Sequence, residues 1–231
     1  MWPAYDRPLA WHTAVVDDSA AETTSARDPV LAAAAATGVP FEIVPCDPDL
    51  ADTAAFCEAY GYRLDRSANA IVVVGKSEPR VYAVCLVLAS SRLDVNGAVR
   101  RKFGVKKASF AAGEETIAIT GMQIGGVTPY GLPAGLPIWI DAAVMECDQV
   151  IVGGGSRDRK LLVPPASLVA LPGAEVVPDL ARPIDPAITV TPLSTPNFVR
   201  LSTDIAPGKP ISLIGAVVNP STQPSRIGGA P

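Results

Sequence analysis

A glycine- and proline-rich loop over residues 121–133 is the part of the chain best suited to chemistry. Its sequence, Gly-Met-Gln-Ile-Gly-Gly-Val-Thr-Pro-Tyr-Gly-Leu-Pro, holds four glycines and two prolines, and Thr128 is its strongest nucleophile. Glycine lets a backbone turn sharply or lie against a ligand, and proline fixes φ and removes an N–H donor. The loop therefore suits recognition through main-chain carbonyl and amide groups, although such clusters also form ordinary turns.

The remaining sequence offers few side chains for acid–base or nucleophilic catalysis. His12 is the single histidine, and no pair of the four cysteines has C-x-x-C spacing. A zinc site or a base-activated cysteine is therefore not expected, and no metal or cofactor is predicted. Any catalysis would rest on backbone dipoles, bound water or the substrate's own groups.

Composition indicates a globular chain without a membrane span. Of the 231 residues, 48% are hydrophobic and 18% are charged, and no apolar run reaches the length of about 18 residues that a bilayer requires. The N-terminus lacks a signal-peptide pattern, so cytoplasmic residence is the expectation.

The net charge of −4 argues against an extended nucleic-acid footprint. Two local basic clusters, residues 100–107 and 157–160, are either solvated surface or contacts for an RNA backbone.

The pattern of apolar residues, caps and turns predicts an α+β fold with a mixed, largely antiparallel sheet flanked by helices. Short turns between strands, such as residues 75–80, argue against a doubly wound parallel sheet. A helix is predicted over residues 29–37 with Asp28 as its N-cap, and a second helix ends at Tyr60 and is capped by Asp49 or Asp52. Further helices are predicted over residues 94–103, 114–121 and 166–171. Strands are predicted over residues 41–45, 69–74, 81–89, 107–110, 137–140, 149–152 and 161–163.

Three regions are expected along the chain. Residues 1–26 form an N-terminal extension without clean periodicity, and residues 27–180 form the main domain. Residues 181–231 contain nine of the 23 prolines. This Pro-rich extension is predicted to be a packed arm, an oligomerisation arm or a partly disordered segment. The oligomeric state is left open.

Four blocks in this order resemble the YbaK family, also called the prolyl-tRNA-editing or aminoacyl-tRNA-synthetase-associated domain. The first is Gly125-Gly-Val-Thr-Pro129, which matches the family's G-x-x-x-P loop; the others cover residues 135–141, 148–157 and 160–168. The resemblance spans roughly residues 28–180 and implies a barrel-like sheet. It also implies hydrolysis of the ester that joins an amino acid to the terminal ribose of a mischarged tRNA. The partner would then be the tRNA 3′ end, with its aminoacyl-adenosine.

The resemblance assigns roles to particular positions. The loop residues Gly125, Gly126, Val127, Thr128 and Pro129 would position the aminoacyl group through their backbone. Substrate-binding positions at the pocket border would be Gly154, Gly155, Ser156 and Arg157. Asp141 matches the family's aspartate after an apolar strand, but it equally suits a cap for a helix over residues 142–146.

One position departs from the family. Members carry a lysine just before the first long apolar strand, where it holds the substrate's phosphate, and this chain has Asn69 there. Lys76 lies at the other end of that strand, over 20 Å away at roughly 3.3 Å per residue. Asn69 would then bind a different group, or Arg157 or Lys160 would supply the charge.

Three functions follow as hypotheses. The first is a trans-acting aminoacyl-tRNA deacylase that uses the backbone-lined loop with assistance from the substrate's ribose hydroxyl. The second is a non-catalytic aminoacyl- or nucleotide-binding module, motivated by Asn69. The third is an unrelated small-molecule enzyme on the same scaffold.

Overall fold

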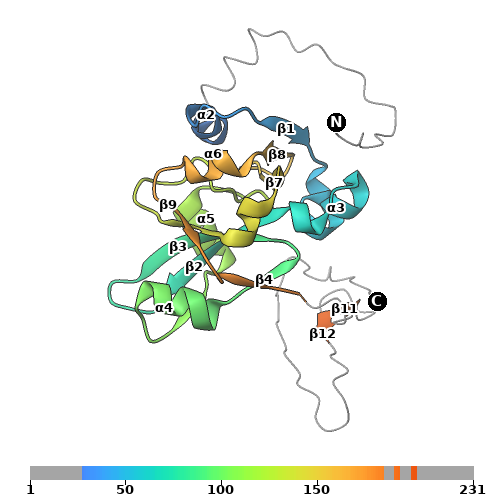
Figure 1. The fold of residues 1–231 in the computed structure, drawn as a ribbon. Coiled ribbons are helices and arrows are strands. Elements are labelled where there is room, and N and C mark those ends of the chain that lie inside the picture. The colour runs from blue at the N-terminus through green and yellow to red at the C-terminus, as the bar shows by residue number, and fades with distance from the viewer. Residues whose placement is uncertain (1–27, 185–189, 193–198, 202–231) are drawn as a thin grey trace, which may run out of the picture. The chain divides into compact units, whose positions relative to one another are not determined.

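The fold is built on two open β-sheets. The computed structural model describes residues 28–184, 190–192 and 199–201. A five-stranded sheet has the order β5-β2-β3-β6-β9, and a three-stranded sheet has the order β1-β8-β7 (Figure 1). The strands of the first are β5 (Ala108–Phe110), β2 (Ala68–Gly75), β3 (Val81–Leu88), β6 (Ile138–Asp141) and β9 (Ala174–Val177). Those of the second are β1 (Glu42–Pro45), β8 (Arg159–Val163) and β7 (Val150–Gly153).

Strand pairing confirms the α+β class and the mixed sheet. The predicted hairpin is β2–β3, whose register runs from Ala68 opposite Leu88 to Gly75 opposite Val81. β5 joins β2 antiparallel, whereas β6 pairs parallel with both β3 and β9. The predicted barrel-like closure is wrong. β5 and β9 are the edges of their sheet, and one isolated bridge, Ser67 to Ile151, joins the two main sheets among the described residues.

Helices start where side-chain caps were predicted. Asp28 caps α2 (Pro29–Ala36), and Asp52 caps α3 (Thr53–Tyr60) by accepting hydrogen bonds from two helix amides in each case. The predicted helix over 94–103 is instead a π-helical turn, η3 (Val95–Val99), followed by α4 (Arg100–Phe103). The remaining helical elements are η1 (Pro48–Leu50), η2 (Leu64–Arg66), α5 (Gly113–Thr120), η4 (Ala142–Glu146) and α6 (Pro165–Val169).

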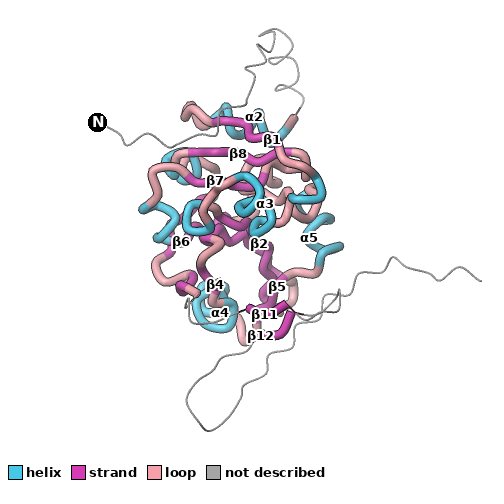
Figure 2. The backbone as a smooth tube through the Cα atoms, turned by 90° about the vertical axis from the view of Figure 1, so that its right-hand side faces the viewer, coloured by secondary structure: helices cyan, strands magenta, loops and turns pink. Residues whose placement is uncertain are grey.

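The main core lies between the two sheets. Both views place the three-stranded sheet above the five-stranded one, with α2 beside its strands (Figures 1 and 2). Buried apolar side chains come from both sheets, including Leu86, Ile140, Val152 and Leu161. A second cluster covers the other face of the five-stranded sheet, where Trp139 packs with residues of η3. β3 is therefore buried on both faces, which explains its continuous apolar run.

Some elements fall outside the predictions. The sequence reasoning missed β4 (Ser91–Leu93), β9 and β10 (Ala181–Pro183), which are short and depend on pairing with distant strands.

The predicted extension over 1–26, and most of that over 181–231, lies outside the described residues. Within the latter, β11 (Val190–Pro192) and β12 (Val199–Leu201) pair antiparallel in a second unit that begins at Pro183. No helix in the described part of the chain is long and apolar enough to cross a membrane.

Candidate functional site

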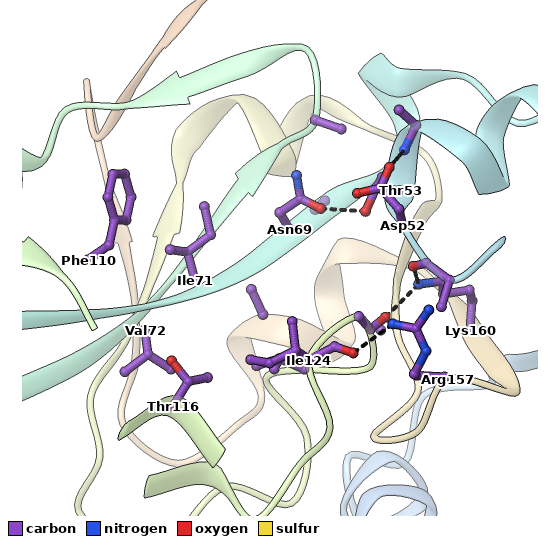
Figure 3. A pocket seen from close by; sticks show the side chains of 18 of the residues that line it. Asp52, Thr53, Asn69, Ile71, Val72, Phe110, Thr116, Ile124, Arg157 and Lys160 are labelled. Carbon is purple, nitrogen blue, oxygen red and sulfur yellow. Dashed lines mark hydrogen bonds between the residues drawn. The ribbon is translucent and has the colours of Figure 1, made fainter. Parts of the chain in front are cut away.

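A cavity of about 550 Å³ lies between the glycine loop and β2 (Figure 3). One wall is β2, from Ala68 to Val72, and another is the start of α3, from Ala51 to Ala54. The glycine loop contributes Ile124, Gly125 and Val127, and the β7–β8 region contributes Gly153, Arg157 and Lys160. Phe110, Ala111 and Thr116 line the cavity from β5, α5 and the loop between them, and Leu64 and Ala89 also contribute. A volume of this size is typical of sites for small organic ligands.

The glycine loop is held by close packing of main chain on main chain. Gly125 has φ of +91°, a conformation that favours glycine. The Gly126 N–H donates to the Gln123 carbonyl at 2.9 Å, and the Gly155 N–H donates to the Gly126 carbonyl at 2.7 Å. A Cβ on Gly126 would lie 2.4 Å from the Ser156 carbonyl oxygen. The loop therefore needs glycine at 126 to rest on the turn that follows β7.

Lys160 is a buried cation in the cavity wall. Its side chain comes from β8 and only 4% of the residue is exposed. Its Nζ donates to the carbonyls of Ala51 at 2.6 Å and Gly125 at 2.8 Å, and lies 5.7 Å from the centre of the Phe56 ring. Burial lowers the pKa of Lys160 below its ordinary value, because an ammonium group loses hydration there.

Arg157 makes a second link between the same two segments. Its guanidinium donates to the Ile124 carbonyl at 3.1 Å and to the Pro48 carbonyl at 2.5 Å. Lys160 and Arg157 thus each join the segment before α3 to the glycine loop (Figure 3). We call this pair of residues the carbonyl clamp.

The carbonyl clamp brings two cations to a cavity whose lining contains one carboxylate, that of Asp52. No carboxylate in the described part of the chain lies within salt-bridge distance of Lys160 or Arg157. Carbonyl groups satisfy N–H donors but do not neutralise a positive charge. Two cations with carbonyl partners beside an open cavity favour a ligand that brings its own negative charge.

Asn69 faces this cavity from β2. Its Oδ1 accepts a hydrogen bond from the Thr53 hydroxyl at 2.6 Å, which orients the amide against the start of α3. Asn69, Gly125 and Lys160 line the same cavity. Asn69 therefore lies in the cavity that the glycine loop also lines, and its neutral amide shares this cavity with a cation from another strand.

The other predicted residues divide into two groups. Gly125, Val127, Asn69 and Arg157 line the cavity. The others lie behind this lining: Gly126, Thr128, Pro129, Gly154, Gly155 and Ser156. Thr128 is fully buried, and its hydroxyl oxygen has no hydrogen-bond partner in the described part of the chain. These residues shape the loop rather than touch the cavity.

Asp141 has a structural position. It is buried, with 4% exposed, and one carboxylate oxygen accepts from the Ala143 N–H at 3.1 Å. The other oxygen accepts from the Ala181 N–H at 2.8 Å. The capping alternative is therefore confirmed, since Asp141 begins η4 and also holds the start of β10. It is not among the residues that line the cavity.

Sequence reasoning missed several residues of the cavity. Asp52 and Thr53 were seen only as the start of a helix, and Phe110 only as the end of a strand. Ile124, Thr116 and Gly153 were not singled out as site residues. Lys160 was noted as a possible source of charge, but its burial was not foreseen. Its place within an apolar run, Lys-Leu-Leu-Val, was the available signal.

Residues 47–171, more than half of the chain, match the family model of the aminoacyl-tRNA editing domain. The chain belongs to this family. The predicted resemblance to YbaK and prolyl-tRNA-editing proteins is thereby confirmed. The match begins just before η1 and ends just after α6, so it contains the carbonyl clamp and both segments that the clamp joins.

Relatives of the editing-domain family agree with this fold. The Bacillus subtilis (strain 168) protein YwhH, described as uncharacterized, is 27% identical over 126 residues, which are 54% of this chain and 77% of that protein. A solved structure described as "a putative trans-editing enzyme for prolyl tRNA synthetase" is 28% identical with a TM-score of 0.57, covering 67% of this chain and 95% of that one. The structure of hypothetical protein APE2540 is 22% identical with a TM-score of 0.58, covering 64% and 95%, and supports the fold alone.

Replacing Gly126 tests the packing of the loop. We expect Gly126→Ala to lower the free energy of unfolding by about 2 kcal/mol, because the new Cβ overlaps the Ser156 backbone. Gly113→Ala is the matched control. Its Cβ would lie 4.0 Å from Ile124 at the start of α5, so stability should be unchanged or slightly raised. Urea unfolding measures both, and equal stability of the two variants would contradict the packing argument.

Replacing Asp141 separates a structural role from a substrate-binding one. Asp141→Ala leaves two backbone N–H groups without their charged acceptor, and we expect it to lower the free energy of unfolding by about 3 kcal/mol. Ligand affinity of the remaining folded protein should be unchanged. A variant with wild-type stability and lost affinity would instead place Asp141 in the binding site.

Proposed function

We propose that the protein is a trans-acting aminoacyl-tRNA deacylase that hydrolyses the ester of a mischarged tRNA. The observation that carries this proposal is the carbonyl clamp, which places two cations without carboxylate partners beside a glycine loop and an open cavity. The tRNA 3′ end carries anionic phosphates, which these cations can bind. Membership of the aminoacyl-tRNA editing domain family supports the same substrate class.

The reaction needs little from the protein beyond positioning. Water attacks the acyl carbon, the bond from that carbon to the ribose oxygen breaks, and the ribose oxygen takes up the proton. Aminoacyl esters are activated, so orientation and stabilisation of the negative oxygen supply the acceleration. The neighbouring ribose hydroxyl can orient the water, which suits a cavity without histidine or a paired carboxylate.

Some backbone N–H donors at the glycine loop already have acceptors within the protein. The N–H groups of Gly126 and Gly155 hold the loop in place by donating to other carbonyls. Stabilisation of the ester oxygen would therefore fall to the main chain of Gly125 and Val127, or to Asn69 and Lys160. In this proposal the glycine loop shapes the cavity and presents only part of its backbone to the substrate.

Lys160 would supply the charge that other family members take from the position of Asn69. It lies in the same cavity, and two of its three N–H donors are used by Ala51 and Gly125. The substrate's terminal phosphate or ester oxygen would receive the third. Asn69 would then contribute neutral hydrogen bonds from the opposite wall.

A non-catalytic binding module on the same fold is the second candidate. Asn69 favours it, because an uncharged amide that already accepts from Thr53 replaces the family's lysine. Such a module would bind an aminoacyl or nucleotide-like ligand without turnover.

Deacylation assays distinguish these candidates. Purified Ala-, Ser- and Cys-tRNA of several acceptors would be incubated with wild type and with Asn69→Lys. We expect wild type to release amino acid from at least one mischarged tRNA, since the cavity already contains a cation. If wild type shows no deacylation and Asn69→Lys does, the result would support the binding module. The absence of deacylation by both proteins across a broad aminoacyl-tRNA panel would refute the deacylase proposal.

A second experiment tests the charge of Lys160. Lys160→Met keeps side-chain length and removes the charge, and we expect kcat/KM for deacylation to fall about 100-fold because the loop and the substrate both lose an anchor. Lys102→Met is the matched control, since Lys102 pairs with Glu175 on the surface. Asn69→Lys added to Lys160→Met should restore part of the activity.

The double variant and the pH dependence of binding separate the electrostatic role of Lys160 from its structural role. Failure of Asn69→Lys to restore any activity would indicate that Lys160 acts only by holding the walls. In wild type, affinity for an amide-linked, non-hydrolysable analogue should weaken as pH rises toward 10.5, because the lowered pKa of Lys160 means that its charge is lost early. In Lys160→Met the affinity should not change over this range.

A further inference from the structure

The cavity has an apolar side opposite the carbonyl clamp. Figure 3 shows Phe110, Ile71 and Val72 toward one side and Lys160 and Arg157 toward the other, with Ile124 between them. Three large apolar residues that line the cavity are exposed, Phe110 at 56%, Ile124 at 48% and Leu64 at 42%. Folding buries most large apolar side chains, so three exposed ones at a single cavity indicate a surface for a partner.

Phe110 presents an exposed aromatic ring from a fixed position on an edge strand. It ends β5, which is an edge strand of the five-stranded sheet. Its backbone is held by pairing with Val73, whereas its ring is open to solvent beside the cavity. An exposed aromatic ring on a rigid strand is the arrangement with which proteins stack single-stranded nucleobases.

We propose that Phe110 stacks against the terminal base of an RNA 3′ end. This inference rests on the proposed function, because it takes the ligand to be an aminoacylated RNA. The ester would lie by the glycine loop and the carbonyl clamp. The base would cover Phe110 at the exposed apolar side of the cavity, which we call the apolar rim. The cavity volume of about 550 Å³ has room for more than an amino acid alone.

Exposure assigns the apolar rim to the base rather than to the amino acid. An amino-acid side chain is selected best in an enclosed pocket, where buried groups surround it. Phe110 is 56% exposed, so a small side chain would bury little of its ring. A flat base can cover the ring, because stacking requires one open face only.

Charge next to Phe110 supports an RNA strand at this edge. Lys106 and Lys107 come directly before β5, and the Lys76 N–H donates to the Lys107 carbonyl at 2.9 Å. All three lysines are exposed. Lys107 is three residues from Phe110, roughly 10 Å along the strand. An RNA chain that leaves the stacked base along β5 would therefore meet a group of ammonium ions that can contact phosphates.

The test compares two amide-linked, non-hydrolysable ligands: an aminoacylated 3′-amino-adenosine and the same aminoacylated amino-ribose without the base. We expect wild type to bind the adenosine ligand more tightly than the ribose ligand. Phe110→Ala should weaken binding of the adenosine ligand roughly tenfold and leave the ribose ligand unchanged. Phe110→Trp should retain the preference for the base. Ile43→Ala, a similarly exposed apolar residue on β1, is the control.

The outcomes separate this inference from the proposed function. Equal loss of both ligands in Phe110→Ala would assign the rim to the amino acid and overturn the inference, as would a wild type that does not distinguish the ligands. Base-dependent binding without deacylation would support the inference and count against the enzyme. Replacing Lys106 and Lys107 with Gln should lower the salt dependence of tRNA binding without affecting the adenosine ligand, and an unchanged salt dependence would refute the path along β5.

Discussion

The cavity depends on two cations that tie together segments far apart in the sequence. Lys160 and Arg157 come from one strand and the turn before it, yet they reach both the segment at residues 48–51 and the loop at residues 124–125. The clamp therefore sets the distance between two walls, and β2 closes the space from the third side.

Such a clamp is costly, which argues for a purpose other than stability. An ammonium group that is nearly excluded from water loses hydration, and two carbonyls with an aromatic ring replace only part of it. The lowered pKa of Lys160 expresses the same cost. An apolar residue at this position would avoid that cost but could not hold the carbonyls. A bound anion would stabilise the charge, so the arrangement is most favourable when the cavity is occupied.

Local signals in the sequence were sufficient for most elements but not for the site. Asp28 and Asp52 marked helix starts because a cap acts on the next few residues, and the β2–β3 hairpin followed from two apolar runs around a short turn. The carbonyl clamp joins residues 109 positions apart, which no local pattern encodes. The sequence therefore predicted Arg157 and Lys160 as sources of charge but not their contacts with these carbonyls. The barrel-like closure was wrong because sheet edges are set by tertiary packing.

The position of the charge changes how a ligand can lie in this cavity. A lysine at position 69 would bring its charge from β2, beside Thr53 and the start of α3. Lys160 brings the charge from β8, fixed against the Gly125 carbonyl. In the proposed function, the negative group of the substrate would be drawn toward the glycine loop, and a base attached to it would be directed to the open apolar side. The fold would then bind an anionic substrate without a lysine on β2.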